Sequence, residues 1–454
     1  MQIVEPGINH LSHTNPFLKG NFAPVTVETT AFDLPVQGTI PEELEGRLLR
    51  IGPNPIQMPQ HQQYHWFTGT GMAHGLRLRG GRAEWYRNRF IVDGMNAPIL
   101  GRPRLPGPEN GAGPNVVNTN ILGISGRTYA TVEAGGLPVE LSYTLESVSR
   151  SNLAGTLEHG FVAHPKYDPS TGQLHAVSYE PKLETLSYMV VEPNGMARTV
   201  AQIPAAHRPM VHDMAFTSKW IVVLDLPVTF DQTIGRGNFP FTWNSDRMPR
   251  IGLLPRDGDV RLLRWIEAPS CFVFHVMNAF DSENAVILDV VRHARVFDKW
   301  RNGPFEAGTM LMRWRIDLLN GKLTETMLEE RNCEFPRFND AFGGKEYRFG
   351  YTASVAADSV NFGPAYKHDV STGQTEIHDY GPACATLEPV FVARQGSTEE
   401  DDGWILSFVY NGERDASDVV ILNAKAFSEK PVAIITLPVR VPFGFHGNWV
   451  TDAG

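Results

Sequence analysis

Short apolar segments separated by turn residues constrain the fold of this chain more than any other feature. They recur along most of its length, are rich in β-branched and aromatic residues, and are bounded by Gly, Pro, Asn or Asp. Only Pro41–Gly46 reads as a helical turn, ending at a glycine. The pattern predicts an all-β protein with strands at Arg47–Ile51, Gly75–Leu78, Ala83–Tyr86, Thr128–Glu133, Leu174–Tyr179, Ser187–Val191, Trp220–Leu224, Ala285–Val291, Leu311–Ile316, Trp404–Tyr410 and Val419–Leu422.

A turn of one kind occurs three times. The sequences DPSTGQ (168–173), DLLNGK (317–322) and DVSTGQ (369–374) each place a glycine four residues after an aspartate. Glycine tolerates the positive φ that such turns require. Repeated strand–turn–strand units favour a β-propeller, although hairpin turns occur in any β protein. The 454 residues contain no linker, so we expect a single domain over residues 1–454, a length that all-β folds reach.

Composition excludes several function classes. A net charge of −10 argues against a nucleic-acid partner, which requires a basic face. Cys271, Cys333 and Cys384 lie far apart and form no CxxC pair, which argues against a zinc ribbon or a disulfide framework and favours a cytoplasmic location. The N-terminus has no signal-peptide pattern, and no apolar run approaches the roughly 18 residues that span a bilayer. Peripheral membrane contact stays open.

Four histidines share an unusual setting. His164 (FVAHPKYD), His212 (MVHDMAF), His275 (CFVFHVMNAFD) and His446 (PFGFHGNW) each follow apolar residues at a strand end or strand entry. Other histidines, among them His293, have no such context. Imidazoles from separate strands that converge on one point suit iron, copper or zinc rather than calcium or magnesium. The sequence therefore predicts a metal site.

Three glutamates also lie in apolar surroundings: Glu133 (YATVEAGGLP), Glu334 (NCEFPRF) and Glu388 (ATLEPVFV). An acid in an apolar strand is costly unless it is paired. Histidine ligands of a metal need a partner on the second ring nitrogen, which fixes the tautomer and the ring orientation. The glutamates are candidates for that role, and the alternative is a solvated position on an edge strand.

The chain resembles the carotenoid cleavage oxygenase family, which also contains stilbene-cleaving dioxygenases and retinal-pigment-epithelium isomerases. NPFLKGNFAPV, LPVQGTIPEELEGRLLRIGPNP and TGTGMAHGLRL match the N-terminal third of that family. AHPKYD, VHDMAF, FHVMNAFD, EFPRFN, EPVFVA, EDDGW and FGFHGNW follow in the family's order. The resemblance implies a seven-bladed β-propeller with a helical or loop cap over a non-haem Fe(II) site.

The resemblance also assigns residues and chemistry. It implies that the iron is bound by His164, His212, His275 and His446, and that Glu133, Glu334 and Glu388 hold three of these histidines. Thr119 (VVNTN) matches a threonine whose methyl group crowds an open iron position. The implied reaction is cleavage of a conjugated carbon–carbon double bond by O2 to give two carbonyl products, without an organic cofactor. The substrate is then an apolar alkene in an apolar tunnel, for which Phe274, Phe335 and Phe445 are candidate lining or core residues.

One position bears on the substrate. Stilbene- and isoeugenol-cleaving members typically carry a lysine directly before the first glutamate, where it holds a phenolic oxygen; this chain has Val132 there. An apolar side chain cannot make that hydrogen bond, which favours a carotenoid or apocarotenoid over a stilbene or another phenylpropanoid alkene. The third alternative, a propeller that binds a ligand without catalysis, conflicts with the complete set of histidines and glutamates.

Overall fold

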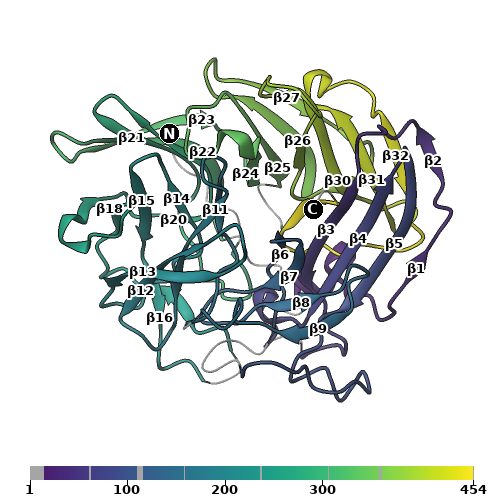
Figure 1. The fold of residues 1–454 in the computed structure, drawn as a ribbon, viewed down its shortest axis with the longest axis horizontal. Helices are drawn as coiled ribbons and strands as arrows, with labels where there is room; N and C mark the ends of the chain where they lie inside the picture. The colour runs from purple at the N-terminus through teal and green to yellow at the C-terminus, as the bar shows by residue number, and fades with distance from the viewer. Residues whose placement is uncertain are drawn as a thin grey trace.

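Seven antiparallel sheets surround a common axis in the computed structural model (Figure 1), which describes residues 15–60, 63–109, 116–157, 159–235, 238–304, 306–356 and 360–452. The predicted seven-bladed β-propeller is thereby confirmed. Residues 1–14, the start of the expected domain, lie outside the described residues. The described residues also contain no helix long and apolar enough to cross a membrane.

Five of the blades are four-stranded, apart from a small added hairpin. The second contains β6 (Asn120–Ile124), β7 (Arg127–Thr131), β8 (Val139–Leu141) and β9 (Ser147–Arg150). The third contains β10 (Lys166–Asp168), β11 (Gln173–Tyr179), β12 (Thr185–Val191) and β13 (Ala197–Pro204). The fourth contains β14 (Met214–Phe216), β15 (Trp220–Asp225), β18 (Arg250–Pro255) and β19 (Arg264–Glu267), with the separate hairpin β16 (Val228–Phe230) and β17 (Phe241–Trp243).

The remaining blades follow the same antiparallel pattern. The fifth contains β20 (Phe272–Ser282), β21 (Ala285–His293), β22 (Thr309–Asp317) and β23 (Leu323–Glu329). The sixth contains β24 (Cys333–Phe338), β25 (Phe349–Val355), β26 (Phe362–Asp369) and β27 (Gln374–His378). The seventh contains β28 (Cys384–Thr386), β29 (Val390–Ala393), β30 (Gly403–Asn411), β31 (Ala416–Asn423), β32 (Ala433–Thr436) and β2 (Val36–Gly38). The first contains β1 (Thr30–Ala31), β5 (Arg82–Phe90), β4 (Gly71–Arg79), β3 (Gly46–Pro53) and β33 (Gly447–Thr451).

Both ends of the chain close the ring. The C-terminal strand β33 pairs with β3 of the first blade, with Asn448 opposite Leu49. The N-terminal strand β2 pairs with β32 of the last blade, with Val36 opposite Ile435. Apolar side chains of the first and seventh blades pack in one buried cluster, which includes Leu76 of β4. Strand pairing at both chain ends and the burial of apolar side chains between the first and seventh blades therefore close the ring together.

The three Asp–Gly turns form as expected. Gly172, Gly321 and Gly373 have φ values of +72°, +72° and +74°. In each turn the glycine N–H donates to the backbone carbonyl of the aspartate, at 2.8, 2.9 and 2.8 Å. The first turn joins β10 to β11, whereas the others join the outer strands β22–β23 and β26–β27. The repeated sequence therefore marks hairpins but not the period of the blades.

Short 3-10 helices and loops replace longer helices. Among the described residues the helices are all of this type: η1 (Pro16–Leu18), η2 (Gly20–Phe22), η3 (Trp66–Thr68), η4 (Val260–Leu262), η5 (Asp340–Phe342) and η6 (Ala424–Ala426). The segment expected as a helical turn, Pro41–Gly46, is a hydrogen-bonded turn and not a helix: the Leu44 N–H donates to the Pro41 carbonyl at 3.1 Å, and Gly46 already begins strand β3. A Cβ there would lie 2.6 Å from the carbonyl oxygen of Val450, so this glycine permits close strand pairing rather than helix termination.

Candidate metal centre

Four histidines reach the propeller axis from four different blades. His164 and His212 each lie two residues before the strand at the inner edge of a blade, β10 or β14. His275 lies within β20, and His446 directly precedes β33. All four are buried. Because the inner strands of a propeller line its axis, residues far apart in sequence meet there.

One ring nitrogen from each histidine lies within 4.8 Å of the corresponding nitrogen of every other. The Nε2 atoms of His164 and His212 are 3.1 Å apart, and those of His275 and His446 are 3.2 Å apart. Imidazole nitrogens bound to one transition metal at about 2.1 Å each lie roughly 3 to 4 Å from one another. The cluster therefore has the dimensions of a single-metal site, and neutral imidazoles suit iron, copper or zinc.

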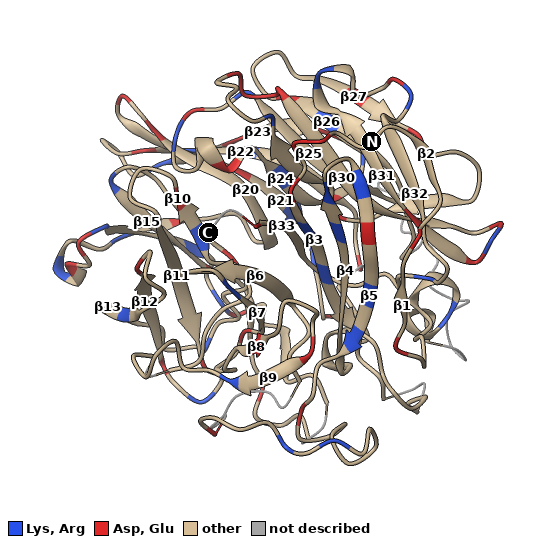
Figure 2. Cartoon of the chain, turned by 45° about the vertical axis from the view of Figure 1, so that its right-hand side comes forward, with Lys and Arg blue, Asp and Glu red and all other residues tan. Residues whose placement is uncertain are grey.

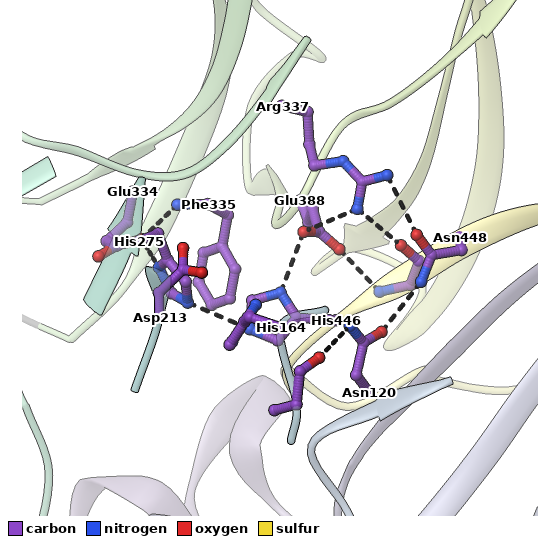
Figure 3. Close-up of polar contacts among 12 residues, drawn as sticks. Asn120, His164, Asp213, His275, Glu334, Phe335, Arg337, Glu388, His446 and Asn448 are labelled. Atoms are coloured by element: carbon purple, nitrogen blue, oxygen red, sulfur yellow. Dashed lines mark hydrogen bonds and ion pairs between the residues drawn. The ribbon is translucent and has the colours of Figure 1, made fainter. Parts of the chain in front are cut away.

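Each predicted glutamate contacts a different histidine of the cluster. The Nδ1 atom of His212 lies 2.9 Å from Glu133 Oε2, and that of His275 lies 2.5 Å from Glu334 Oε2. The Nδ1 atom of His446 lies 3.0 Å from Glu388 Oε1 (Figure 3). An ionised carboxylate only accepts hydrogen bonds, so Nδ1 carries the proton and Nε2 keeps its lone pair.

This tautomer is what a metal site requires. In His275 and His446 both Nδ1 atoms face carboxylates, so two Nε2 lone pairs face each other across 3.2 Å. Such a contact is repulsive in an uncharged site and is relieved by a cation between the two rings. The donor set of the described residues therefore fits a bound metal ion.

Each glutamate has a further residue beside it that the sequence did not identify. Burial and the neighbouring Glu133 carboxylate raise the pKa of Tyr179 well above its usual value, and His293 Nε2 lies 2.8 Å from Glu334 Oε1. Arg337 Nη1 lies 3.3 Å from Glu388 Oε1. His293 ends a strand with no distinguishing neighbours, so only the fold reveals its partner. Arg337 had a signal that could have been used, since it lies three residues after Glu334 within the EFPRF motif.

Burial and paired charges set the protonation of the cluster. Burial, reinforced by the neighbouring imidazoles, lowers the pKa of His164 well below its usual value. Burial also lowers the pKa of His446 to about 4, against the opposing effect of Glu388. Burial alone would raise the pKa of Glu388, but Arg337 and His446 lower it to about 2. At neutral pH these groups are neutral imidazoles and an ionised carboxylate, the states that bind a metal cation.

Local backbone irregularity aims two side chains of the site. The pairing of β20 with β21 shifts register between Val273 and Val276, on both sides of His275. The pairing of β24 with β25 shifts between Glu334 and Arg337, and Phe335 in between has a φ of +57°. Bulges re-aim side chains next to active sites, and positive φ is strained for a bulky residue. The Phe335 ring then lies 5.3 Å from the ring of His275, centroid to centroid.

Thr119 directly precedes β6 and adjoins the cluster. Its carbonyl accepts a hydrogen bond from the backbone N–H of His446 at 3.1 Å. Its hydroxyl donates to Asn118 Oδ1 at 2.9 Å. Thr119 lines the same cavity as His212, His275 and His446. The threonine singled out in the sequence is therefore part of the wall around the histidines.

An apolar cavity of about 510 Å³ reaches the histidine cluster. Trp66 and Phe67 of η3, Met95 and Phe239 line it from connections between strands, which form a loop cap. The three phenylalanines named from the sequence also line it and are buried: Phe274, Phe335 and Phe445. Its volume and apolar walls are those of a site for a small apolar molecule.

A second cavity, of about 860 Å³, also reaches the cluster, and polar and apolar atoms contribute to its walls in similar measure. Its lining includes Arg47, Arg77, Lys166 and Arg337. Figure 2 shows basic residues along β3, β4 and β5. Acidic partners accompany several of these cations: Arg77 pairs with Asp452, and Lys166 with Asp213. The histidine cluster therefore lies between an apolar cavity and a cavity with a mixed, partly charged lining.

Comparisons with known proteins agree with this architecture. Residues 22–451 match the family model described as retinal pigment epithelial membrane protein. A carotenoid cleavage oxygenase of Mycobacterium tuberculosis is 38% identical, over 96% of this chain and 97% of the relative. The lignostilbene dioxygenase of Pseudomonas brassicacearum superposes with a TM-score of 0.86 at 27% identity, covering 99% of this chain and 100% of that chain.

A cobalt-substituted apocarotenoid oxygenase from Synechocystis superposes with a TM-score of 0.82 at 26% identity, covering 94% of this chain and 97% of that chain. These matches confirm the resemblance inferred from the motifs and extend over nearly the whole chain. Together with the buried four-histidine cluster, they show that the chain belongs to the carotenoid cleavage oxygenase family and is an oxygenase.

Proposed function

We propose that this oxygenase uses ferrous iron and O2 to cleave a conjugated carbon–carbon double bond of a carotenoid or apocarotenoid. One alkene and one O2 molecule give two carbonyl products, so the electrons balance without an external reductant. The observation that carries the proposal is the apolar cavity whose wall includes three of the four buried, clustered histidines, His212, His275 and His446. Bound iron supplies the dioxygen chemistry that side chains lack.

The chain's own residues have positioning roles in this proposal. His164, His212, His275 and His446 are the iron ligands. Glu133, Glu334 and Glu388 hold three of the rings with Nε2 directed to the metal, and their charges raise the donor strength of these rings. Thr119 restricts the space next to the cluster.

The cavity wall selects and orients the alkene. Phe67, Phe274, Phe335 and Phe445 supply aromatic surface against which a conjugated chain packs. Such a wall excludes water from the reacting double bond and offers few polar groups that could hydrogen-bond to a polar substrate. No protein acid or base is needed for the proposed reaction.

Val132 supports an isoprenoid polyene as the substrate. This side chain is buried, lines the cavity and directly precedes Glu133. It offers no hydrogen bond to a phenolic oxygen. The second candidate is cleavage of a hydroxystilbene by the same chemistry, which the close superposition with the lignostilbene dioxygenase favours.

A paired substrate assay tests the proposal. The iron-loaded protein is incubated under O2 with an apocarotenal and, separately, with a hydroxystilbene, and the carbonyl products are identified by mass spectrometry. Cleavage of the apocarotenal with incorporation of 18O from 18O2 is the expected result. Cleavage of the hydroxystilbene alone would assign the second function. Absence of about one iron per chain in the purified protein would overturn both.

A further inference from the structure

His164 differs from the other three histidines in how it is held. Glutamates orient the rings of His212, His275 and His446. Next to His164 the hydrogen bonds are made instead by the carbonyl group of Ala163, directly before it, and by the side chain of Lys166, two residues after it. We propose that Asn120 and the Lys166–Asp213 pair are positioning residues that fix His164 at the metal centre. This inference rests on the proposed metal site and adds residues to it.

The contact before His164 comes from the neighbouring blade. Asn120 Nδ2 in β6 donates to the carbonyl oxygen of Ala163 at 2.7 Å. Asn120 is itself held, because its Oδ1 accepts from Asn448 Nδ2 at 2.9 Å. Asn448 Oδ1 in turn accepts from Arg337 Nη2 at 3.1 Å (Figure 3). The peptide that leads into His164 is thus tied to the partner of Glu388.

Lys166, two residues after His164, contacts residues of the fourth and fifth blades. Lys166 Nζ lies 2.8 Å from Asp213 Oδ2 and 3.3 Å from the carbonyl oxygen of Val276. The same carboxylate accepts from the Val276 N–H at 2.8 Å and from the Met214 N–H at 2.7 Å. Asp213 directly follows His212, and Val276 directly follows His275. One ion pair therefore joins the backbone segments of three histidines.

Burial makes these contacts strong determinants of position. The Asp213 side chain is 1% exposed and that of Lys166 is 24% exposed. Removal of either partner leaves the other charge poorly solvated, so the segments would shift to find new contacts. Groups that orient metal ligands typically change metal affinity by about 10- to 100-fold when substituted. We expect that range here, although none of the three side chains contacts the metal position.

The chain offers a matched control. Lys367 Nζ also lies 2.8 Å from an aspartate oxygen, Asp401 Oδ2, and it also donates to a backbone carbonyl, that of Ala424. Its side chain is 4% exposed. Lys367 lies on β26 of the sixth blade and Asp401 lies two residues before β30 of the seventh, and neither blade contributes a histidine to the cluster. Lys367→Met therefore reproduces the loss of a buried Lys–Asp pair away from the metal centre.

The test uses cobalt-loaded protein produced in cobalt-supplemented medium. Its visible absorption spectrum and its rate of cobalt loss to a chelator are measured for the wild type, Lys166→Met, Asn120→Ala, Lys166→Arg and Lys367→Met. We expect Lys166→Met and Asn120→Ala to lose cobalt about 10- to 100-fold faster, with an altered spectrum. Lys166→Arg should restore most of the wild-type behaviour. Lys367→Met should lower the melting temperature without changing the spectrum or the rate.

The outcomes separate this inference from the proposed function. If the wild type binds cobalt and both Lys166→Met and Asn120→Ala match its spectrum and rate, the positioning role is refuted while the metal site stands. If the wild type binds neither cobalt nor iron, both fail. If Lys166→Met does not fold, Asn120→Ala decides, because the hydrogen bonds it removes, to Ala163 O and from Ile121 N and Asn448 Nδ2, are all neutral and no charge is left unpaired.

Discussion

The Nε2 atoms of His275 and His446 lie 3.2 Å apart although 171 residues separate them in the sequence. His275 belongs to the fifth blade, and His446 directly precedes the strand that closes the first. The metal centre is therefore complete only when the ring is closed. We therefore expect metal binding and closure of the propeller to be coupled, since a ligand that binds only the folded state stabilises it.

Truncation of the chain after Arg440 should abolish both metal binding and stable folding. The shortened chain loses His446 and the β33 strand, which pairs with β3. The point substitution His446→Ala removes the ligand but keeps the strand. We expect the truncated chain to be unfolded by circular dichroism, and His446→Ala to fold with much less than one iron per chain by mass spectrometry. A folded, iron-loaded truncated chain would contradict the coupling.

Glu388→Gln should weaken iron binding by about 10- to 100-fold, because the amide accepts from His446 Nδ1 without supplying charge. It should also destabilise the protein by about 3 kcal/mol, since Arg337 loses its buried counter-ion. Iron affinity and urea unfolding measure the two effects.

The double variant Arg337→Met/Glu388→Gln separates the two effects of the Glu388 substitution. It should recover much of the stability, because no unpaired charge is left, while iron binding stays weak. Equal iron affinity in wild type and Glu388→Gln would refute the role of this carboxylate.

The sequence predicted the architecture and the histidines for identifiable reasons. Strands bounded by turn residues indicated an all-β fold, and ordered motifs indicated the propeller. The motifs also contained the four histidines and two of the three glutamates that the structure brings into contact, Glu334 and Glu388, whereas Glu133 was found in a separate apolar segment. These residues stand out because a buried imidazole or carboxylate is unusual in an apolar segment.

The partners of these residues could not be predicted, because their roles depend on contacts between blades. Tyr179 and His293 look like ordinary strand residues until the fold places them beside Glu133 and Glu334. Asn120 meets Ala163 across a blade boundary. The bulge at His275 also depends on how β20 pairs with β21, which local sequence does not specify.

Val132→Lys should shift substrate preference toward phenolic alkenes. The new ammonium would lie in the apolar cavity next to Glu133, where it can hold a phenolic oxygen. We expect kcat/KM for an apocarotenal to fall about 10-fold or more and the ratio of hydroxystilbene to apocarotenal turnover to rise. Val132→Ile, which keeps the wall apolar, is the control. An unchanged turnover ratio in Val132→Lys would show that this position does not determine substrate preference.

Acid should destabilise the protein through buried neutral histidines outside the metal centre. His74 on β4 is 3% exposed, and its Nδ1 lies 2.9 Å from the hydroxyl of Tyr86. Burial, with a smaller effect of the nearby Arg50, lowers the pKa of His74 to about 3. Between pH 6.5 and 3 the unfolded chain binds a proton here that the folded chain does not, so acidification favours unfolding.

His74→Gln tests this pH dependence, because glutamine does not titrate. We expect the free energy of unfolding of the wild type to fall by about 1 kcal/mol more per pH unit than that of the variant between about pH 6 and 4. Above about pH 7 the two stability curves should run parallel, since the histidine is then neutral in both states. Urea unfolding at several pH values measures the difference, and parallel curves across the whole range would show that His74 does not contribute.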